Sequence, residues 1–288
     1  MSRPLSVVVV FFAALFRLQA APGVPAGFAF QYREGLLWIK VSTPQSARPL
    51  NFLLDSGAEV SVIALATAER LGLALHEPVS VKSVESSMTG FRTQGLRATA
   101  NGVALPDELL ALDLSKLSHA CKEPVDGLIG ADFIKGRIVE IDFEAERVRL
   151  LRAGDALFGS GSPLLELPLR AGACELCTEI GVNGGRPQRF RVDTGCATPL
   201  QWVTTAVGLK HCGTKVAIGL AKLAIPQGQT TVGLGGQIFH NVPTGLHRKA
   251  IFDGEAGLVG NGLLSRFKTV TFDTAAGRLI LSGLRASE

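Results

Sequence analysis

One stretch decides the fold of this chain: Phe52-Leu53-Leu54-Asp55-Ser56-Gly57-Ala58-Glu59-Val60-Ser61-Val62-Ile63. Its aspartate follows an apolar run, and a charged carboxylate that leaves a buried strand is costly unless neighbouring groups hold it. The Ser and Gly that follow are typical of a tight turn, whose backbone N–H groups and hydroxyl can bond that carboxylate. Because the tripeptide Asp-Ser-Gly is common in turns, it indicates a special site only if a second feature supports it.

The same arrangement occurs a second time, at Phe190-Arg191-Val192-Asp193-Thr194-Gly195. Downstream of each copy lies a segment of two apolar residues and a glycine, Leu128-Ile129-Gly130 after the first and Leu258-Val259-Gly260 after the second. Two copies in one chain predict that two carboxylates, those of Asp55 and Asp193, are brought face to face.

The second half of the chain repeats further features of the first half in the same order. The offset between matching positions is 138 residues for Asp55 and Asp193 and falls in small steps to 130 for Gly130 and Gly260. Such steps are expected if the halves are copies that differ by loop deletions, so we predict a duplicated fold. Three further matches are Gly72 with Gly208, the turn Asn101-Gly102 with Gly235-Gly236, and Asp142 and Arg147 with Asp273 and Arg278.

The four motifs resemble those of the bilobal aspartic peptidases of the pepsin type, and the first copy resembles the active-site segment of retropepsins. The resemblance implies an all-β fold of two pseudo-twofold-related lobes with short helices, in which each apolar-apolar-Gly segment crosses behind its aspartate. It implies that Asp55 and Asp193 are the catalytic residues. Around them, two hydroxyls would reach across to the opposite lobe, and two glycines would let backbone N–H groups approach the carboxylates. These supporting residues are Ser56, Gly57, Thr194 and Gly195.

The chemistry of such a pair follows from its charge. Two carboxylates about 3 Å apart cannot both ionise cheaply, so one holds a proton while the other stays charged. They titrate as a pair, and we assign their roles to Asp55 and Asp193 jointly. The charged partner can take a proton from a bound water, and the protonated partner can donate to the scissile carbonyl oxygen. This reaction needs no metal and no cofactor, and we predict none.

The residue after each active-site glycine bears on the pH optimum. Pepsin-type enzymes usually have Ser or Thr there, whereas this chain has Ala58 and Cys196, which is nearer the retropepsin pattern. Losing a hydrogen bond to the charged carboxylate favours protonation. We therefore expect a pH optimum milder than that of pepsin.

A polar segment between two alternating runs predicts a long β-hairpin. The runs are Val79–Val84 and Leu96–Ala100, and the exposed tip is expected within residues 85–92. The resemblance implies that this hairpin is a flap over bound peptide, while a plain surface hairpin is the alternative. The tyrosine that pepsin-type flaps carry is missing, since the only tyrosine is Tyr32. The flap residues expected to contact substrate are Met88, Thr89, Gly90 and Phe91.

The N-terminus has the plan of a signal peptide. Arg3 precedes an apolar stretch from Leu5 to Phe16, which is too short to span a bilayer comfortably. Cleavage is expected after one of the small residues at positions 20, 21 or 26, and a buried N-terminal strand or an uncleaved anchor is the alternative. We predict a secreted or periplasmic monomer with no membrane anchor after cleavage. Its divisions are a signal peptide (1–26), an N-terminal peptidase lobe (27–153), a linker (154–163) and a C-terminal peptidase lobe (164–288).

The basic residues and the cysteines give weaker indications. The net charge of +4 is scattered, apart from short clusters such as Arg186, Arg189 and Arg191, which we interpret as a solvated strand edge. A nucleic-acid partner is therefore not predicted. Up to two disulfides are expected in an oxidising compartment, with a connectivity that the sequence does not reveal. The five cysteines are Cys121, Cys174, Cys177, Cys196 and Cys212.

The spacing Cys174-x-x-Cys177 also suggests a metal or redox site. A zinc site would need two more ligands, of which Cys212 and His211 are the nearest candidates, and there is no second close-spaced pair. A helix start of the kind that redox pairs use is not indicated at Cys174. Packing or a disulfide is the preferred interpretation.

Three functions remain open from the sequence. The preferred one is an exported aspartic endopeptidase acting on a peptide or protein substrate in extended conformation. The second is a non-catalytic peptide- or carbohydrate-binding protein of the same fold. The third is a two-carboxylate glycoside hydrolase, which the low aromatic content of 6% does not favour, because sugar grooves are rich in aromatic residues.

Overall fold

The structure is a computed structural model that describes residues 25–83, 86–155, 165–171, 176–205, 214–217 and 223–285. The predicted signal peptide lies outside the described residues except for Pro25 and Ala26, and the predicted linker does so beyond Asp155. Within the described ranges the chain forms three β-sheets and four short helices. No helix in these ranges is long and apolar enough to cross a membrane.

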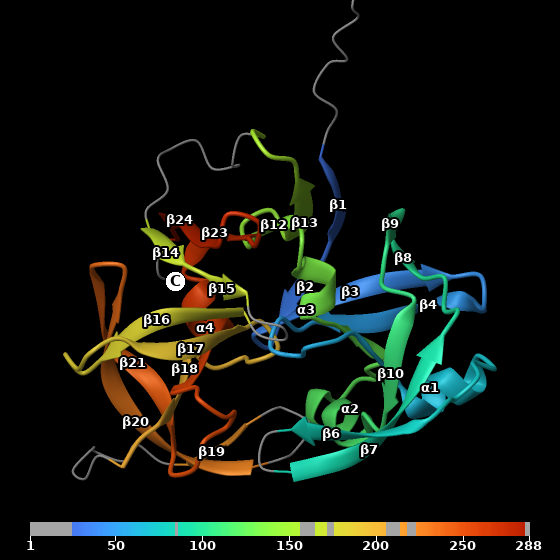
Figure 1. Ribbon diagram of the computed structural model, residues 1–288, viewed down its shortest axis with the longest axis horizontal. Coiled ribbons are helices and arrows are strands. Elements are labelled where there is room, and N and C mark those ends of the chain that lie inside the picture. The colour runs from blue at the N-terminus through green and yellow to red at the C-terminus, as the bar shows by residue number, and fades with distance from the viewer. Residues whose placement is uncertain are drawn as a thin grey trace, which may run out of the picture.

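The N-terminal half forms a ten-stranded sheet, seen on the right in Figure 1. Short β2 (Gln31–Arg33) pairs with one of its strands and extends it at one side. The other strands, in sheet order, are β6 (Pro78–Ser83), β7 (Ser86–Gln94), β10 (Glu108–Leu112), β5 (Val62–Ala64), β11 (Gly127–Ile129), β4 (Ser46–Leu54), β3 (Leu36–Thr43), β8 (Thr99–Ala100) and β9 (Val103–Ala104).

The C-terminal half forms an eight-stranded sheet on the left of the same view. An additional pairing between its second and seventh strands closes it partly on itself. In sheet order the strands are β15 (Arg170–Ala171), β16 (Leu176–Val182), β17 (Gln188–Asp193), β22 (Gly257–Gly260), β18 (Leu200–Val203), β21 (Gln237–His247), β20 (Leu223–Leu234) and β19 (Thr214–Ala217).

A six-stranded sheet joins the halves and lies at the top of Figure 1. At its middle, Glu140 pairs with Thr271, which is 131 residues away, the same offset that relates Asp142 to Asp273. Glu140 and Thr271 are therefore counterparts in the repeat that face each other, as an approximate twofold axis between the lobes requires. The predicted bilobal all-β fold is confirmed. In order the strands are β1 (Ala26–Ala29), β13 (Arg147–Leu151), β12 (Ile138–Asp142), β23 (Phe267–Asp273), β24 (Arg278–Leu284) and β14 (Leu165–Pro168).

In both lobes the apolar-apolar-Gly segment lies beside the strand that ends at the aspartate. β11 runs parallel to β4, with Ile129 opposite Leu54, and β22 runs parallel to β17, with Gly260 opposite Asp193. A glycine is needed at the end of β22, because a Cβ there would lie 2.3 Å from the carbonyl oxygen of Thr198. The predicted crossing behind each aspartate is present.

The four helices are short and follow the strands that build the lobes. α1 (Leu65–Arg70) is followed by Gly72, whose φ of +67° suits the end of a helix. The others are α2 (Ser115–Cys121), α3 (Ala131–Ile134) and α4 (Asn261–Leu264), of which α3 and α4 follow the two crossing segments directly.

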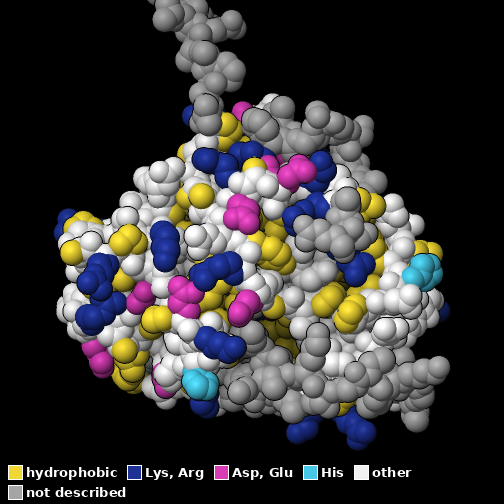
Figure 2. Space-filling view, turned by 180° about the vertical axis from the view of Figure 1, so that it is seen from behind, with side chains coloured by type: hydrophobic (Ala, Val, Ile, Leu, Met, Phe, Trp, Pro, Cys, Tyr) yellow, Lys and Arg dark blue, Asp and Glu magenta, His cyan; other side chains and the backbone are white. Residues whose placement is uncertain are grey.

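One apolar core runs through both lobes and the joining sheet. It contains fully buried phenylalanines from each part, among them Phe28, Phe133, Phe190 and Phe272. A second, smaller cluster lies in the N-terminal lobe around Trp38. On the face shown in Figure 2, basic side chains are spread over the described surface with acidic ones among them.

The hairpin predicted from residue 79 onward differs from its expected form. β6 agrees with the expected first strand, but residues 86–94 form β7 instead of a polar tip, and Val81 pairs with Met88. Residues 84–85, between these two strands, lie outside the described residues. The segment was predicted as a hairpin tip because it is polar. Both strands project from the sheet, however, and polar side chains suit such strands as well as loops. The predicted turn at Asn101-Gly102 is present between β8 and β9.

Candidate active site

The two Asp-containing turns meet where the lobes face each other. Asp55 follows the last residue of β4, and Asp193 is the last residue of β17. A Cβ added to Gly57 would lie 2.5 Å from Oδ1 of Asp193, and one added to Gly195 would lie 2.4 Å from Oδ1 of Asp55. Each carboxyl group thus packs against the glycine of the opposite turn, where no larger residue fits.

The two carboxyl groups hydrogen-bond to each other and are held unequally by backbone N–H groups. The N–H groups of Gly57 and Ala58 donate to Oδ1 of Asp55 over 3.0 and 3.1 Å. For Asp193 the corresponding donor is Gly195 alone, over 2.8 Å. Hydrogen bonds to the charged form favour it, so Asp55 is the better-stabilised carboxylate.

The pKa values of the pair follow the same asymmetry. Burial raises the pKa of both Asp55 and Asp193 above the ordinary value. The pKa of Asp193 is raised well above it, because the nearby Asp55 charge and the hydrogen bond to Asp55 add to burial. The hydrogen bonds to Asp55 pull its pKa back down. These directions favour a pair that shares one proton, with Asp193 the carboxyl whose surroundings favour the protonated form more strongly.

Two buried hydroxyls fix the turns against each other. The N–H of Ser56 donates to Oγ1 of Thr194 over 2.9 Å, and the N–H of Thr194 donates to Oγ of Ser56 over 3.0 Å. Each hydroxyl in turn donates to a carbonyl of the opposite lobe, Ser56 to Val192 over 2.7 Å and Thr194 to Leu54 over 2.9 Å. This is the crossed arrangement that the resemblance implied, and it sets the relative position of the two aspartates.

Further polar residues that sequence reasoning missed hold the turns from behind. In the first lobe Asp132 accepts hydrogen bonds from the N–H and the Oγ of Ser61, over 2.8 and 2.7 Å, and Ser61 accepts from the N–H of Gly130. In the second lobe Nδ2 of Asn261 donates to the carbonyl of Thr194 over 2.6 Å. The only signal in the sequence was a polar residue one or two positions after each crossing segment.

A buried ion pair lies beneath the second turn. Arg191 and Glu255 are 2% and 6% exposed and form two hydrogen bonds of 3.0 and 2.7 Å, while Nη1 of Arg191 donates to the carbonyl of Gly57 over 2.9 Å. The interpretation of Arg191 as part of a solvated strand edge is therefore wrong. Its aliphatic neighbours in the strand are buried, and a buried arginine needs a partner that the local sequence did not reveal.

The predicted flap residues lie in β7, away from its turn. Gly90 is buried, and a Cβ on it would lie 2.3 Å from a methyl carbon of Leu112. Met88 packs against the smaller cluster around Trp38, which Ala197 of the second lobe also touches. Thr89, at the neighbouring position, is exposed.

The described cysteines are buried thiols. Burial raises the pKa of Cys121 to about 11 and that of Cys196 to about 12, and it also raises the pKa of Cys177. Since the thiolate is the reactive form, none of the three is suited to act as a nucleophile. Cys174 and Cys212 lie outside the described residues, as does His211, so the Cys-x-x-Cys pair is described only at its second member.

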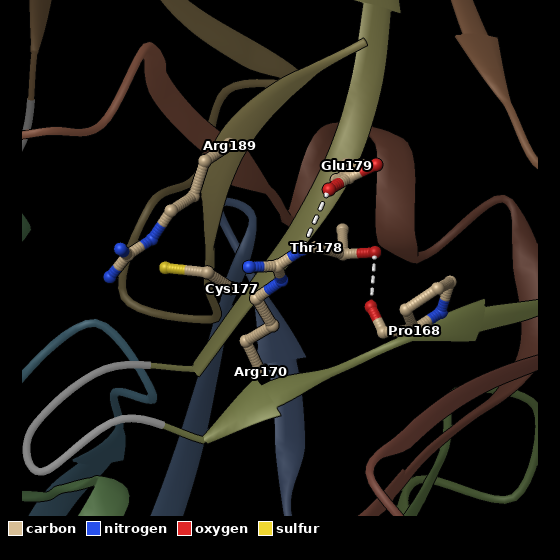
Figure 3. A pocket seen from close by; sticks show the side chains of 6 residues that line it. All are labelled: Pro168, Arg170, Cys177, Thr178, Glu179 and Arg189. Carbon is tan, nitrogen blue, oxygen red and sulfur yellow. Dashed lines mark hydrogen bonds and ion pairs between the residues drawn. The ribbon is translucent and has the colours of Figure 1, made fainter.

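A small cavity of about 70 Å³ lies at the edge of the second lobe. Figure 3 shows it between β15, β16 and β17, where Arg170 pairs with Glu179 over 3.3 Å and Thr178 donates to the carbonyl of Pro168 over 2.9 Å. Its lining does not include either aspartate. Among the described residues no group of three or more His, Cys, Asp or Glu side chains is placed to hold a metal ion.

Comparison with known proteins agrees with this geometry. Residues 40–133 match the family model described as aspartyl protease. The chain is similar to the crystal structure of the aspartic proteinase from Irpex lacteus, with a TM-score of 0.56 and 12% sequence identity over 91% of this chain and 98% of that one. At this identity the likeness concerns the fold. No curated protein matches the chain.

The matched segment contains Asp55 and its turn, and the structural likeness extends over both lobes. The chain therefore has the bilobal aspartic proteinase fold, and residues 40–133 of its first lobe match the aspartyl protease family model.

Proposed function

We propose that the protein is an exported aspartic endopeptidase that hydrolyses peptide bonds with a water activated between Asp55 and Asp193. The observation that carries the proposal is the pair of carboxyl groups between the lobes, each packed against the glycine of the opposite turn and held by backbone N–H groups. The family match supports peptidase activity, and the fold of the Irpex lacteus aspartic proteinase supports the same class.

The reaction uses the inequality of the two carboxyls. Asp55, held by two N–H groups, is charged and takes a proton from the water, whose oxygen attacks the scissile carbonyl carbon. Asp193 gives its proton to the carbonyl oxygen, which yields a tetrahedral diol. When the diol collapses, the proton taken by Asp55 passes to the leaving nitrogen, and Asp193 regains a proton from the diol. No covalent intermediate with the enzyme forms, and the pair returns to its initial state.

The substrate is proposed to be an extended peptide. Among the described residues, no strand pairs with the outer edge of β6, and peptide strands commonly add to such edges through backbone hydrogen bonds. Met88 and Ala197, which meet at the same apolar cluster from opposite lobes, would contact a substrate side chain. Thr89, Gly90 and Phe91 belong to the same flap hairpin.

Export rests on the N-terminal sequence. Ala26 is the first residue of β1 and pairs with Leu150, so cleavage after Ala20 or Ala21 leaves this strand whole. We therefore favour these two sites over Ala26. N-terminal sequencing of the protein recovered from the medium or the periplasm tests this, and recovery of the intact chain from the cytoplasm would contradict it.

Substitution of the aspartates tests the catalytic proposal. Asp55→Asn and Asp193→Asn should each lower kcat/KM on a peptide library by at least about 10³-fold, because neither leaves a pair that can act as both acid and base. Asp113→Asn, on an exposed loop, is the matched control and should keep wild-type activity. A statine-type mimic of the diol should inhibit the wild-type protein.

The same assay separates the other functions. Retained peptide binding without cleavage by wild-type protein would favour a non-catalytic binding protein. Glycoside hydrolysis is disfavoured because carboxyls in direct hydrogen-bonding contact are closer than the roughly 5 Å that even retaining glycosidases use. Peak turnover below pH 3 on a protein substrate would contradict the milder optimum expected from Ala58 and Cys196.

A further inference from the structure

The ion pair of Arg191 and Glu255 occupies a position where charge is costly. Taking both groups out of water carries a desolvation penalty that a buried ion pair often does not recover, so stability alone is a weak reason to have it. The counterpart of Arg191 in the first lobe, at the offset of 138 residues, is Leu53, which is buried in an apolar cluster. The second lobe thus has a buried charged side chain at a position where the first lobe, with the same fold, has a leucine.

The guanidinium is oriented from three sides. Its Nε and Nη2 bind the two carboxylate oxygens of Glu255, and its face lies 3.7 Å from the ring centroid of Phe252. The remaining nitrogen, Nη1, donates to the carbonyl oxygen of Gly57 in the opposite lobe over 2.9 Å. Gly57 belongs to the turn that packs against the Asp193 carboxyl and donates its N–H to Asp55.

We propose that Arg191 is a positioning residue for the catalytic pair, which holds the first-lobe turn through the Gly57 carbonyl and places a buried positive charge beneath both carboxyl groups. Glu255 and Phe252 aim the guanidinium at that carbonyl. The inference rests on the proposed peptidase function and deepens it, since it names a residue outside the two motifs that sets the pH range of the reaction.

The electrostatic effect has a definite sign. The positive charge of Arg191 lowers the pKa of both Asp55 and Asp193, against the effect of burial. Other titratable groups face these side chains: Glu255 and Cys177 are next to Arg191, and Cys196 is next to the pair. Both thiols have raised pKa values and stay neutral, so the guanidinium and the Glu255 carboxylate are the charges that can shift the pair.

Removing the charge of Arg191 and removing the charge of Glu255 should therefore shift the pKa values of the aspartate pair in opposite directions. Arg191→Met removes the positive charge. In the profile of kcat/KM against pH, both the acidic and the basic limb should then move to higher pH, by about one unit. Glu255→Gln leaves the guanidinium less neutralised and should move them to lower pH. If Arg191 served only in packing, both variants would lower activity, and their pH profiles would not shift in opposite directions.

Two further variants separate position from charge. Arg191→Lys keeps the charge but has no planar fork to hold Glu255 and Gly57 together, so kcat should fall about tenfold while the limbs stay in place. Arg189→Met is the matched control, because Arg189 lies two residues earlier on β17 and pairs with Glu179 in the strand register. It should leave both limbs and kcat unchanged.

The single variants leave a buried charge without its partner and can fail to fold. The double variant Arg191→Met with Glu255→Leu removes both charges and provides the decisive measurement. Its limbs should still move to higher pH, because the lost guanidinium is the group that lowers the pKa of both carboxyls. Limbs that coincide with those of the wild type in this folded variant would overturn the proposal.

The carboxyl titrations decide the inference independently of turnover. Carbon-13 NMR of labelled aspartate should show both titrations of the pair at higher pH in the double variant than in the wild type. If the wild-type protein cleaves no peptide, the proposed function fails, and this titration still tests Arg191. If it cleaves peptide and the titrations do not move, the function stands and the role of Arg191 is wrong.

Discussion

The two aspartates, although related by the repeat, sit in unequal surroundings. Asp55 receives two backbone N–H donors and Asp193 receives one, so the proton rests on Asp193. Neither Ala58 nor the thiol of Cys196, which lies 3.2 Å from Oγ1 of Thr198, offers a hydroxyl to a carboxyl. The difference that makes one carboxyl an acid and the other a base thus comes from a few backbone contacts and from burial.

The raised pKa of Asp193 predicts a particular dependence of stability on pH. Because the folded state keeps a proton that the unfolded chain loses above about pH 4, this residue destabilises the fold increasingly as the pH rises from there toward the folded pKa. The Asp193→Asn variant has a neutral amide in place of this carboxyl, so it lacks this pH-dependent loss of stability. Its midpoint of urea unfolding should exceed that of the wild type at pH 7.

This difference should shrink toward pH 4, where the wild-type carboxyl is protonated in both states. Each pH unit between the two pKa values contributes up to about 1.4 kcal/mol. Glu59→Gln, which removes an exposed carboxyl on the turn of the opposite lobe, serves as the control and should show no comparable trend. A pH-independent difference between Asp193→Asn and the wild type would contradict the assignment of the proton.

Strand ends and turns carry the next level of organisation. Asp55 directly follows β4 and Asp193 is the last residue of β17, and the crossed hydroxyls of Ser56 and Thr194 tie these strand ends together. Each hydroxyl both accepts from an N–H and donates to a carbonyl, so two backbone groups depend on it. Losing one hydroxyl leaves two buried backbone groups without a partner.

Thr194→Val tests this dependence because it keeps the shape of the side chain. The N–H of Ser56 and the carbonyl of Leu54 would lose their partner in a buried site, which we expect to cost about 2–4 kcal/mol of unfolding free energy. Thr194→Ser keeps the hydroxyl and should cost about 1 kcal/mol or less for the lost methyl group. Equal losses for Val and Ser in urea unfolding would show that packing, not hydrogen bonding, fixes the turns.

The two lobes are joined by a sheet to which both contribute strands. β12 and β23 pair at its centre, and Val139, Val270 and Phe272 on these strands belong to the core that runs through both lobes. Elements that share a sheet and a core are expected to unfold together. The rigid placement of the two aspartates depends on this coupling.

Each lobe contains one tryptophan that can report on it separately, Trp38 in the first and Trp202 in the second. In variants that keep only one of them, with phenylalanine at the other, fluorescence should give the same urea midpoint. Val270→Ala in the shared sheet should lower both midpoints equally, by the equivalent of about 2 kcal/mol. Two separate midpoints would show that the lobes unfold independently.

The features that the sequence predicted are those that recur within it. The duplicated Asp motifs, the crossing segments and the turn at Asn101-Gly102 all involve neighbours in the chain, whose local chemistry is sufficient to predict them. The hairpin turn was misplaced, because polarity does not distinguish the projecting strand β7 from a loop. Arg191 was misinterpreted, because its partners Glu255 and Gly57 are 64 and 134 residues away.

By itself, the sequence determined the duplication, the two aspartates and their tight turns, because these depend on residue types a few positions apart. The tertiary structure alone decided which carboxyl holds the proton, how Ser61 and Asp132 support the first turn, and that Arg191 reaches across to Gly57. Burial and electrostatic interactions depend on distances between groups that the fold brings together from remote parts of the chain. Those distances exist only once the lobes have closed on each other.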